Sequence, residues 1–242
     1  MALHFVTAEA SAAAVGDTVT LTGAEAKHAA VVRRVRVGEQ ITLGDGSGVW
    51  LSGAASLVEA TRVDVQITSR TEVERPSPQL VLVQALAKGD RDELAVQASC
   101  ELGVDEIVPW QAARSVSRWE GAKAAKGRER WATIVREAAK QAHRAWIPTV
   151  SEVQSTAQLA QRASTQRMLL LEPSATIRLT ELELDGRDIV LVVGPEGGIS
   201  GDELERLEAA GAERVVLGDA VLRTSTAGPA AIAVLSAALG RW

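Results

Sequence analysis

Cysteine, histidine, tyrosine and phenylalanine are scarce in this sequence of 242 residues. It contains one cysteine (Cys100), three histidines, one phenylalanine and no tyrosine. A single cysteine excludes an intramolecular disulfide and fits a reducing, cytoplasmic environment. The lack of clustered cysteine and histidine residues, which supply most zinc ligands, predicts that no metal ion is bound.

Long hydrophobic runs are also missing. No apolar stretch approaches the ~20 residues that a membrane-spanning helix requires. The first ten residues, MALHFVTAEA, lack the basic start and long apolar core of a signal peptide. With 46% hydrophobic residues and a net charge of −5, the composition is typical of a globular protein with no membrane partner. The length allows one large domain or two modest domains.

Positive charge is concentrated in one segment of this acidic chain. Residues 114–144 contain nine Lys or Arg against three Glu, a net charge of +6 in 31 residues. A basic segment on an acidic protein indicates a site for a polyanion such as RNA. On charge alone, a solvated helix face explains the same pattern equally well.

Residues 1–72 show the pattern of a small β-barrel. The segments DTVTLTG, EQITLGDGSGVWLSGAAS and TRVDVQITSR alternate apolar and polar residues, and Gly-Asp-Gly-Ser-Gly is typical of a hairpin turn. GAEAKHAAVVRRVRV, between two of them, is expected to begin as a short helix. Residues 73–79 carry two prolines and charged residues, which favours a linker.

Residues 80–242 alternate buried strands with helices. LVLVQAL, DEIVPW, RMLLLEP, DIVLVV and ERVVLGD are apolar, strand-like runs, and helical patterns separate most of them. This order predicts an α/β domain with a mainly parallel sheet covered on both faces.

The strand-like run at 189–193 ends in the turn Gly-Pro-Glu-Gly-Gly. Three glycines permit a tight turn that a ligand can approach closely, and Pro195 stiffens it. Ser200 and Glu203 have the spacing of a capping box that starts the next helix. The turn carries no phosphate-binding motif and places a carboxylate, Glu196, at its centre. Because ligands of parallel sheets bind beyond the carboxyl ends of the strands, we expect a ligand here.

Several motifs together resemble one family of RNA-modifying enzymes. HAAVVRRVRVGEQITLGDGSG, KGDRDELAVQASCELGVDEIVP, RERWATIVREAAKQAHR, LVVGPEGGIS and VLGDAVLRTSTA are similar to the RsmE family of the SPOUT class of methyltransferases. The resemblance covers essentially the whole chain. It implies a PUA-like RNA-binding barrel (1–72), a linker (73–79) and a SPOUT domain (80–242) with a deep trefoil knot. It also implies a homodimer.

The resemblance further implies an activity. Members of the family transfer a methyl group from S-adenosyl-L-methionine (SAM) to N3 of a specific uridine in 16S ribosomal RNA. The partner is therefore 16S rRNA or the assembled small ribosomal subunit. A ribose 2′-O-methyltransferase with the same SPOUT fold, and a non-catalytic RNA-binding assembly factor, remain alternatives. A nucleotide-dependent α/β enzyme is disfavoured by the missing phosphate motifs.

Arg223 is the first candidate catalytic residue, because a guanidinium stabilises the negative charge of a uracil that has lost its N3 proton. The other candidate, Glu196, contacts the cofactor's amino group or a ribose hydroxyl, or assists proton removal. Arg223 alternatively caps or ion-pairs its own loop, and the nearby threonines are caps or cofactor contacts. The resemblance implies these cofactor-binding residues: Leu171, Glu172, Gly194, Pro195, Glu196, Gly197, Leu217, Gly218, Leu222, Arg223, Thr224 and Thr226.

RNA contacts are expected from both parts of the chain. In the helix predicted from GRERWATIVREAAKQAHRAW, basic and polar residues share the face opposite Trp131, which indicates RNA or dimer contacts or a plain ion-pair stripe. The expected RNA-binding residues are His28, Arg33, Arg34, Arg36, Arg114, Arg130, Gln141 and Arg144.

Overall fold

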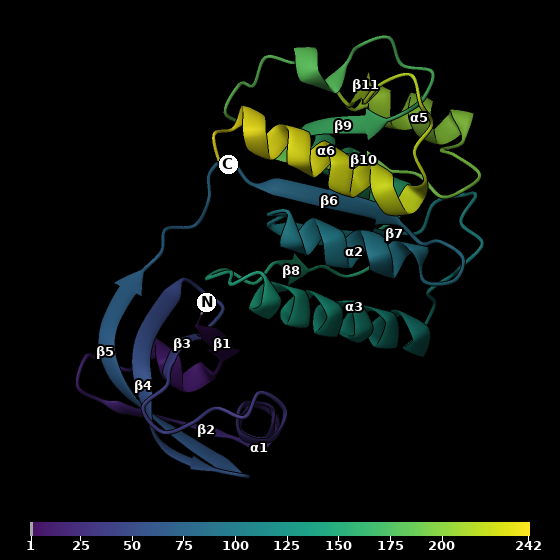
Figure 1. Cartoon of the computed structure of the whole chain (residues 1–242). Coiled ribbons are helices and arrows are strands. Elements are labelled where there is room, and N and C mark those ends of the chain that lie inside the picture. Colours follow the sequence, from purple (N-terminus) through teal and green to yellow (C-terminus); the bar gives the residue numbers. More distant parts are fainter. Residues whose placement is uncertain (1) are drawn as a thin grey trace. The chain divides into compact units, whose positions relative to one another are not determined.

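The computed structural model describes residues 2–242 and divides the chain into two compact units (Figure 1). The first unit runs to Arg75 and also includes Ala139–Ile147. The second unit comprises Pro76–Ala138 and Pro148–Trp242. None of the helices in the described residues is long and apolar enough to cross a membrane.

The first unit is built on a curved, mixed five-stranded sheet (Figure 1). Its order is β1-β3-β4-β5-β2, in which only the β1–β3 pair is parallel. The edge strands β1 and β2 do not pair within residues 2–242, so the sheet is a half-barrel rather than a closed barrel. The expected strands are present, and β1 is an additional one. Their bounds are β1 (Leu3–Val6), β2 (Thr18–Thr22), β3 (Gln40–Gly44), β4 (Val49–Glu59) and β5 (Arg62–Glu72).

Alternating side chains of these strands form a separate apolar core. Phe5, Leu21, Ile41 and Leu51 are almost fully buried in it. The predicted helix is present as α1 (Gly23–Lys27), which continues into one π-helical turn (His28–Val32). A short 3-10 helix, η1 (Ala8–Ser11), follows β1.

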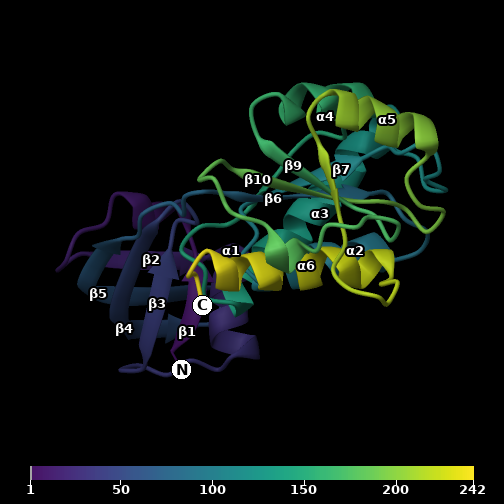
Figure 2. The ribbon, with the colours of Figure 1, turned by 90° about the horizontal axis from the view of Figure 1, so that it is seen from above.

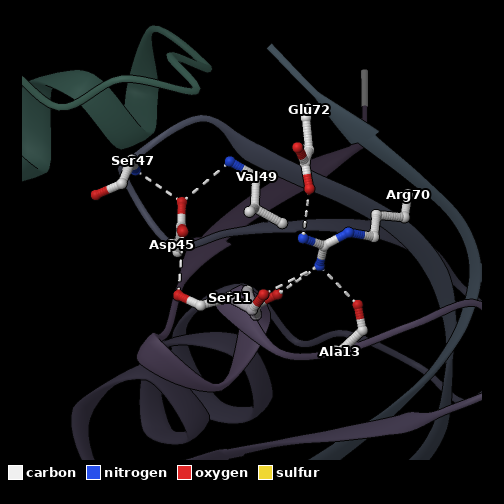
Figure 3. A network of polar contacts seen from close by, with 8 residues as sticks. Ser11, Ala13, Asp45, Ser47, Val49, Arg70 and Glu72 are labelled. Carbon is white, nitrogen blue, oxygen red and sulfur yellow. Dashed lines mark hydrogen bonds and ion pairs between the residues drawn. The ribbon is translucent and has the colours of Figure 1, made fainter. Parts of the chain in front are cut away.

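Arg70, near the end of β5, secures η1 against the sheet (Figure 3). Its Nη1 donates to the carbonyl oxygens of Ala10, Ser11 and Ala13 at 3.3, 3.2 and 2.8 Å. Its Nη2 donates to the Glu72 carboxylate at 2.9 Å. One guanidinium thus bonds three carbonyl groups at and just beyond the end of η1.

The segment 139–147 packs with the first unit, whereas the predicted boundary placed it in the second domain. The Gly48 N–H donates to the Ala145 carbonyl at 3.0 Å, and Trp146 Nε1 donates to the Val73 carbonyl at 2.8 Å. Lys140 forms a buried ion pair with Glu25 at 2.8 Å. These contacts join residues far apart in sequence, and the periodicity of a local segment does not predict such contacts.

The second unit contains a parallel six-stranded sheet with the order β11-β9-β10-β6-β7-β8. The chain starts near the centre, moves outward through β7 and β8, and then returns to add β9, β10 and β11 on the other side. All five expected strands are present, and the short β8 is additional. Their bounds are β6 (Leu80–Ala85), β7 (Glu106–Trp110), β8 (Thr149–Val150), β9 (Arg167–Leu171), β10 (Ile189–Val193) and β11 (Glu213–Val215).

Helices cover both faces of this sheet, as the alternating pattern predicted. Contacts and Figure 2 place α2 and α6 on one face and α4 and α5 on the other. Gly228 allows α6 to approach the strands closely, since a Cβ there would lie 2.9 Å from Leu82 Cδ1. The bounds are α2 (Arg91–Glu101), α3 (Ala122–Gln141), α4 (Thr156–Ala163), η3 (Leu179–Glu181), α5 (Gly201–Ala209) and α6 (Thr224–Ala238).

Candidate active site

A cavity of about 740 Å³ lies at the carboxyl ends of β9, β10 and β11. Three turns that follow these strands form most of its wall, together with the start of α6, Arg91 at the start of α2 and Arg114 from the loop after β7. The lining residues are Arg91, Arg114, Leu171, Glu172, Pro173, Val193, Gly194, Pro195, Glu196, Gly197, Gly198, Ile199, Val215, Val216, Leu217, Ala220, Val221, Leu222, Arg223, Thr224 and Ala227.

The turn after β10 requires glycine at two positions. A Cβ on Gly194 would lie 2.9 Å from Ile199 Cγ1, a distance that real Cβ atoms do not adopt. Gly198 has a φ of 72°, in the left-handed region that glycine favours. Its N–H donates to the Pro195 carbonyl at 2.9 Å, which closes the turn.

The predicted capping box at the start of α5 is confirmed. Ser200 Oγ accepts from the Glu203 N–H, and the Glu203 carboxylate accepts from the Ser200 N–H at 3.2 Å. The same buried carboxylate accepts from the Ala113 N–H and the Thr156 hydroxyl, both at 2.8 Å. Glu203 therefore fixes the turn to the loop after β7 and to α4.

Glu196 lines the cavity and also connects its turn to the loop between β6 and α2. Its Oε1 accepts from the Lys88 N–H at 3.1 Å and from Arg91 Nη1 at 3.2 Å. In the first turn of α2, burial raises the pKa of Asp92, whose carboxylate accepts the Ala87 N–H. Arg91 was not predicted, because the sequence KGDRDEL does not distinguish it from an ordinary charge at a helix start.

Arg114 reaches the turn from the loop after β7. Its Nη1 donates to the carbonyl oxygen of Gly197 at 2.9 Å, with the Ile199 carbonyl at 3.5 Å. The sequence placed Arg114 among the RNA contacts, whereas the structure places it in the cavity wall, bonded to the backbone of the glycine-rich turn.

The third turn ends at Arg223, the N-cap of α6. Within residues 2–242 the Arg223 guanidinium makes no hydrogen bond or ion pair, while its carbonyl accepts from the N–H groups of Thr226 and Ala227. Thr224 is 8% exposed, and its hydroxyl donates to the Gly194 carbonyl at 2.9 Å. The structure therefore places an unpaired cation next to a tightly held hydroxyl.

Ten of the twelve predicted cofactor residues line this cavity. Gly218 lies instead in a smaller cavity of about 200 Å³, which shares Pro173, Val216, Ala220 and Val221 with the first. Thr226 lines neither of the two cavities, and its hydroxyl donates to the Arg223 carbonyl at 3.2 Å. This hydroxyl bonds back to the preceding turn and caps no N–H group at the start of α6.

Comparisons with known proteins cover most of the chain and agree with one another. Residues 74–236 match the RNA methyltransferase domain family, and residues 21–53 match the RNA methyltransferase PUA domain family. Ribosomal RNA small subunit methyltransferase E from Mycobacterium bovis is 42% identical, and the alignment covers 94% of this chain and 89% of the relative. The Bacillus subtilis protein of that name is 33% identical, with 90% of each chain covered.

This chain belongs to the ribosomal RNA small subunit methyltransferase E family. Solved structures agree with this family assignment. The Neisseria gonorrhoeae member bound to SAM is 31% identical, with a TM-score of 0.87 and 98% of each chain covered. A methyltransferase from Legionella pneumophila, also with bound SAM, is 32% identical, with a TM-score of 0.88 and the same coverage.

The RNA-binding residues expected for this family are distributed over both units. In the first unit, Arg33, Arg34 and Arg36 are exposed in the loop that follows the π-helical turn, and Arg34 has a left-handed φ of 56°. His28 is half-buried, and its ring lies edge-on to Phe5 at 6.0 Å. The three arginines are therefore exposed close together in sequence on the PUA-like unit.

The predicted helical face on α3 needs a correction. α3 ends at Gln141, so Arg144 lies beyond the helix and does not share a helical face with Arg130. His143 adopts a left-handed φ of 53°. The His143 and Arg144 N–H groups bond to the carbonyls of Lys140 and Ala139, at 3.2 and 3.0 Å, in a Schellman motif that ends the helix.

Arg130, from the same predicted face, pairs with a neighbouring helix. Its Nη2 donates to the Glu93 carboxylate of α2 at 2.7 Å, and this carboxylate raises the pKa of Arg130. In the structure, the charge of Arg130 is therefore offset by an acidic partner within the second unit.

Proposed function

We propose that this chain methylates N3 of a uridine in small-subunit ribosomal RNA with SAM as the methyl donor. The observation that carries the proposal is the unpaired Arg223 guanidinium at the wall of the 740 Å³ cavity. Family membership and the SAM-bound relatives support the donor and the RNA substrate class.

The cavity fits SAM in size and in chemistry. Its volume of about 740 Å³ lies within the range of roughly 300–1,000 Å³ usual for cofactor sites. Leu171, Leu217 and Leu222 provide an apolar wall for a flat ring. Glu172 and Glu196 provide carboxylates that suit hydroxyl and ammonium groups. When bound, SAM supplies a methyl group on a sulfonium, which is a good leaving group.

The residues of this chain have distinct proposed roles. Arg223 stabilises the negative charge on the uracil carbonyl oxygens after the N3 proton is lost, which lowers the barrier for attack by N3. We assign Glu196 to positioning, because its Oε1 already accepts hydrogen bonds from the Lys88 N–H and Arg91. Arg33, Arg34 and Arg36 hold the RNA phosphates without reading sequence.

The remaining expectations belong to the same proposal. A homodimer is supported by α6, where Ala230, Ala233 and Val234 are apolar yet only half-buried in the single chain. Light scattering at micromolar concentration tests it, and a monomer mass would contradict it. A trefoil knot and a cytoplasmic location follow from the family resemblance and from the single cysteine.

Labelled SAM and small ribosomal subunits that lack the modification provide the test. After incubation with the purified chain, nucleoside mass spectrometry should detect a methyl group on the uracil ring. Label on a ribose would instead identify a 2′-O-methyltransferase. Binding of RNA and SAM without any label transfer would identify a non-catalytic RNA-binding protein.

A further inference from the structure

Gln84 is a fully buried polar residue in the core strand β6. It is 0% exposed, and the other residues of the strand, Leu80–Val83 and Ala85, are apolar and equally buried. Its partners in the sheet are Val193 of β10 and Pro109 of β7. A buried amide is costly unless it forms hydrogen bonds, so its contacts identify its role.

Two consecutive hydrogen bonds connect the Gln84 amide to the cavity wall. Its Nε2 donates to Thr224 Oγ1 at 2.9 Å, and Thr224 Oγ1 donates to the Gly194 carbonyl at 2.9 Å. Thr224 starts α6 and Gly194 starts the glycine-rich turn, and both line the cavity. Three segments distant in sequence are therefore joined by two consecutive hydrogen bonds.

The Gln84 amide N–H fixes the direction in which the Thr224 hydroxyl donates its proton. A hydroxyl carries one proton, and because Gln84 Nε2 donates to Thr224 Oγ1, that proton is directed to the Gly194 carbonyl. Gln84 Oε1 is buried without a partner among residues 2–242. Leaving a buried acceptor without a partner is unfavourable. The hydrogen bond that Nε2 donates to Thr224, and not one accepted by Oε1, therefore holds the amide in place.

We propose that Gln84 is a positioning residue for the cofactor pocket: through Thr224, it holds the glycine-rich turn and the start of α6 at the separation that SAM requires. This inference rests on the proposed function. Arg223 directly precedes Thr224, so the same hydrogen bonds fix the backbone from which the Arg223 guanidinium extends.

Calorimetric SAM binding, without RNA, tests the role of Gln84. Gln84→Met keeps the volume and removes the donor, and Thr224→Val keeps the shape and removes the hydroxyl. We expect each to raise the Kd for SAM roughly fivefold to tenfold, as the loss of one hydrogen bond does. The double variant should bind no more weakly than Thr224→Val alone, and Thr224→Ser should retain nearly wild-type affinity.

Ser236 provides the matched control. It is buried on the same helix, and its hydroxyl donates to the Leu102 carbonyl at 3.3 Å outside the cavity. Ser236→Ala should lower the Tm and leave the Kd for SAM unchanged. Unchanged SAM affinity in Gln84→Met or in Thr224→Val, or additive losses in the double variant, would overturn the positioning role. Failure of the wild-type chain to bind SAM would overturn the proposed function itself, and this inference with it.

Discussion

The Arg114 guanidinium donates a hydrogen bond to the Gly197 carbonyl oxygen at 2.9 Å, and the same nitrogen lies 3.5 Å from the Ile199 carbonyl oxygen. One side chain thus contacts both ends of the segment that leads from the glycine-rich turn into α5. These carbonyl groups lie at a cavity wall, where a moving backbone would change the shape of the ligand site.

Arg114→Met should therefore weaken SAM binding, because the apolar side chain cannot hold the turn. We expect the Kd to rise about tenfold, since hydrogen bonds from charged donors contribute roughly 1.5–3 kcal/mol. Calorimetry measures this, with Arg118→Met in the same loop as the control. If Arg114 contacts RNA instead, SAM affinity will stay unchanged. The slope of log RNA affinity against log salt concentration will then become shallower by about 1, the value for one phosphate contact.

Arg223→Ala should have a different effect. A guanidinium that stabilises charge in the transition state contributes to the rate more than to cofactor binding, so we expect kcat to fall by about 100-fold or more. The Kd for SAM should change less than about threefold, within the effect of one weak contact. Single-turnover methylation and calorimetry on one preparation separate the two effects. A parallel loss of rate and SAM affinity would assign Arg223 to cofactor binding.

The arginines expected to bind RNA can be ranked by their partners in the structure. Arg33→Ala and Arg36→Ala remove exposed charges from the PUA-like unit and should each weaken RNA binding and reduce its salt dependence. Arg130→Gln should have little effect on RNA affinity, because Glu93 already pairs with Arg130. Filter binding at several salt concentrations measures all three variants. A loss for Arg130→Gln equal to that for Arg33→Ala would show that Arg130 also contacts RNA.

The sequence was sufficient to predict where the cavity lies. Apolar runs predicted the parallel strands, and the rule that ligands bind beyond their carboxyl ends indicated a ligand at the turn that starts at Gly194. Leu171 and Leu217 were implied by the family resemblance. Gly194 itself is explained locally, by a turn that has no room for a Cβ.

The sequence could not show which side chains hold that cavity in place. Arg91, Arg114 and Gln84 act through contacts with residues about 80 to 140 positions away in the chain. Such pairs depend on strand order and register, which periodicity does not encode. The end of α3 was missed for a local reason, because a histidine, His143, occupies the left-handed position where glycine is the usual signal.

Arg70→Ala should destabilise the first unit. The variant leaves the carbonyls of Ala10, Ser11 and Ala13 without their shared donor, and we expect a loss of about 2 kcal/mol in the free energy of unfolding. Hydrogen exchange of amides in β1 to β5 measures this unit separately. Glu72→Gln, which alters only the exposed ion pair, should cost much less. Equal effects would show that the carbonyl contacts contribute nothing.

His4 should make the stability of the first unit depend on pH. Its ring stacks on Trp50 at 4.2 Å, and Nδ1 is 3.0 Å from the Thr42 hydroxyl. Burial, together with the charges of His143 and Lys140, lowers the pKa of His4 from 6.5 to about 4.

Because the folded pKa of His4 is the lower one, the unfolded chain binds the extra proton, and stability falls as the pH drops. The contribution is complete above pH 6.5 and is lost between pH 6.5 and 4, by up to about 3 kcal/mol. His4→Phe preserves the ring stack and removes the titrating group. Hydrogen exchange of β1 and β3 amides at pH 7, 5.5 and 4.5 should show a shallower decline for His4→Phe than for the wild type. Parallel declines would exclude His4 as the source.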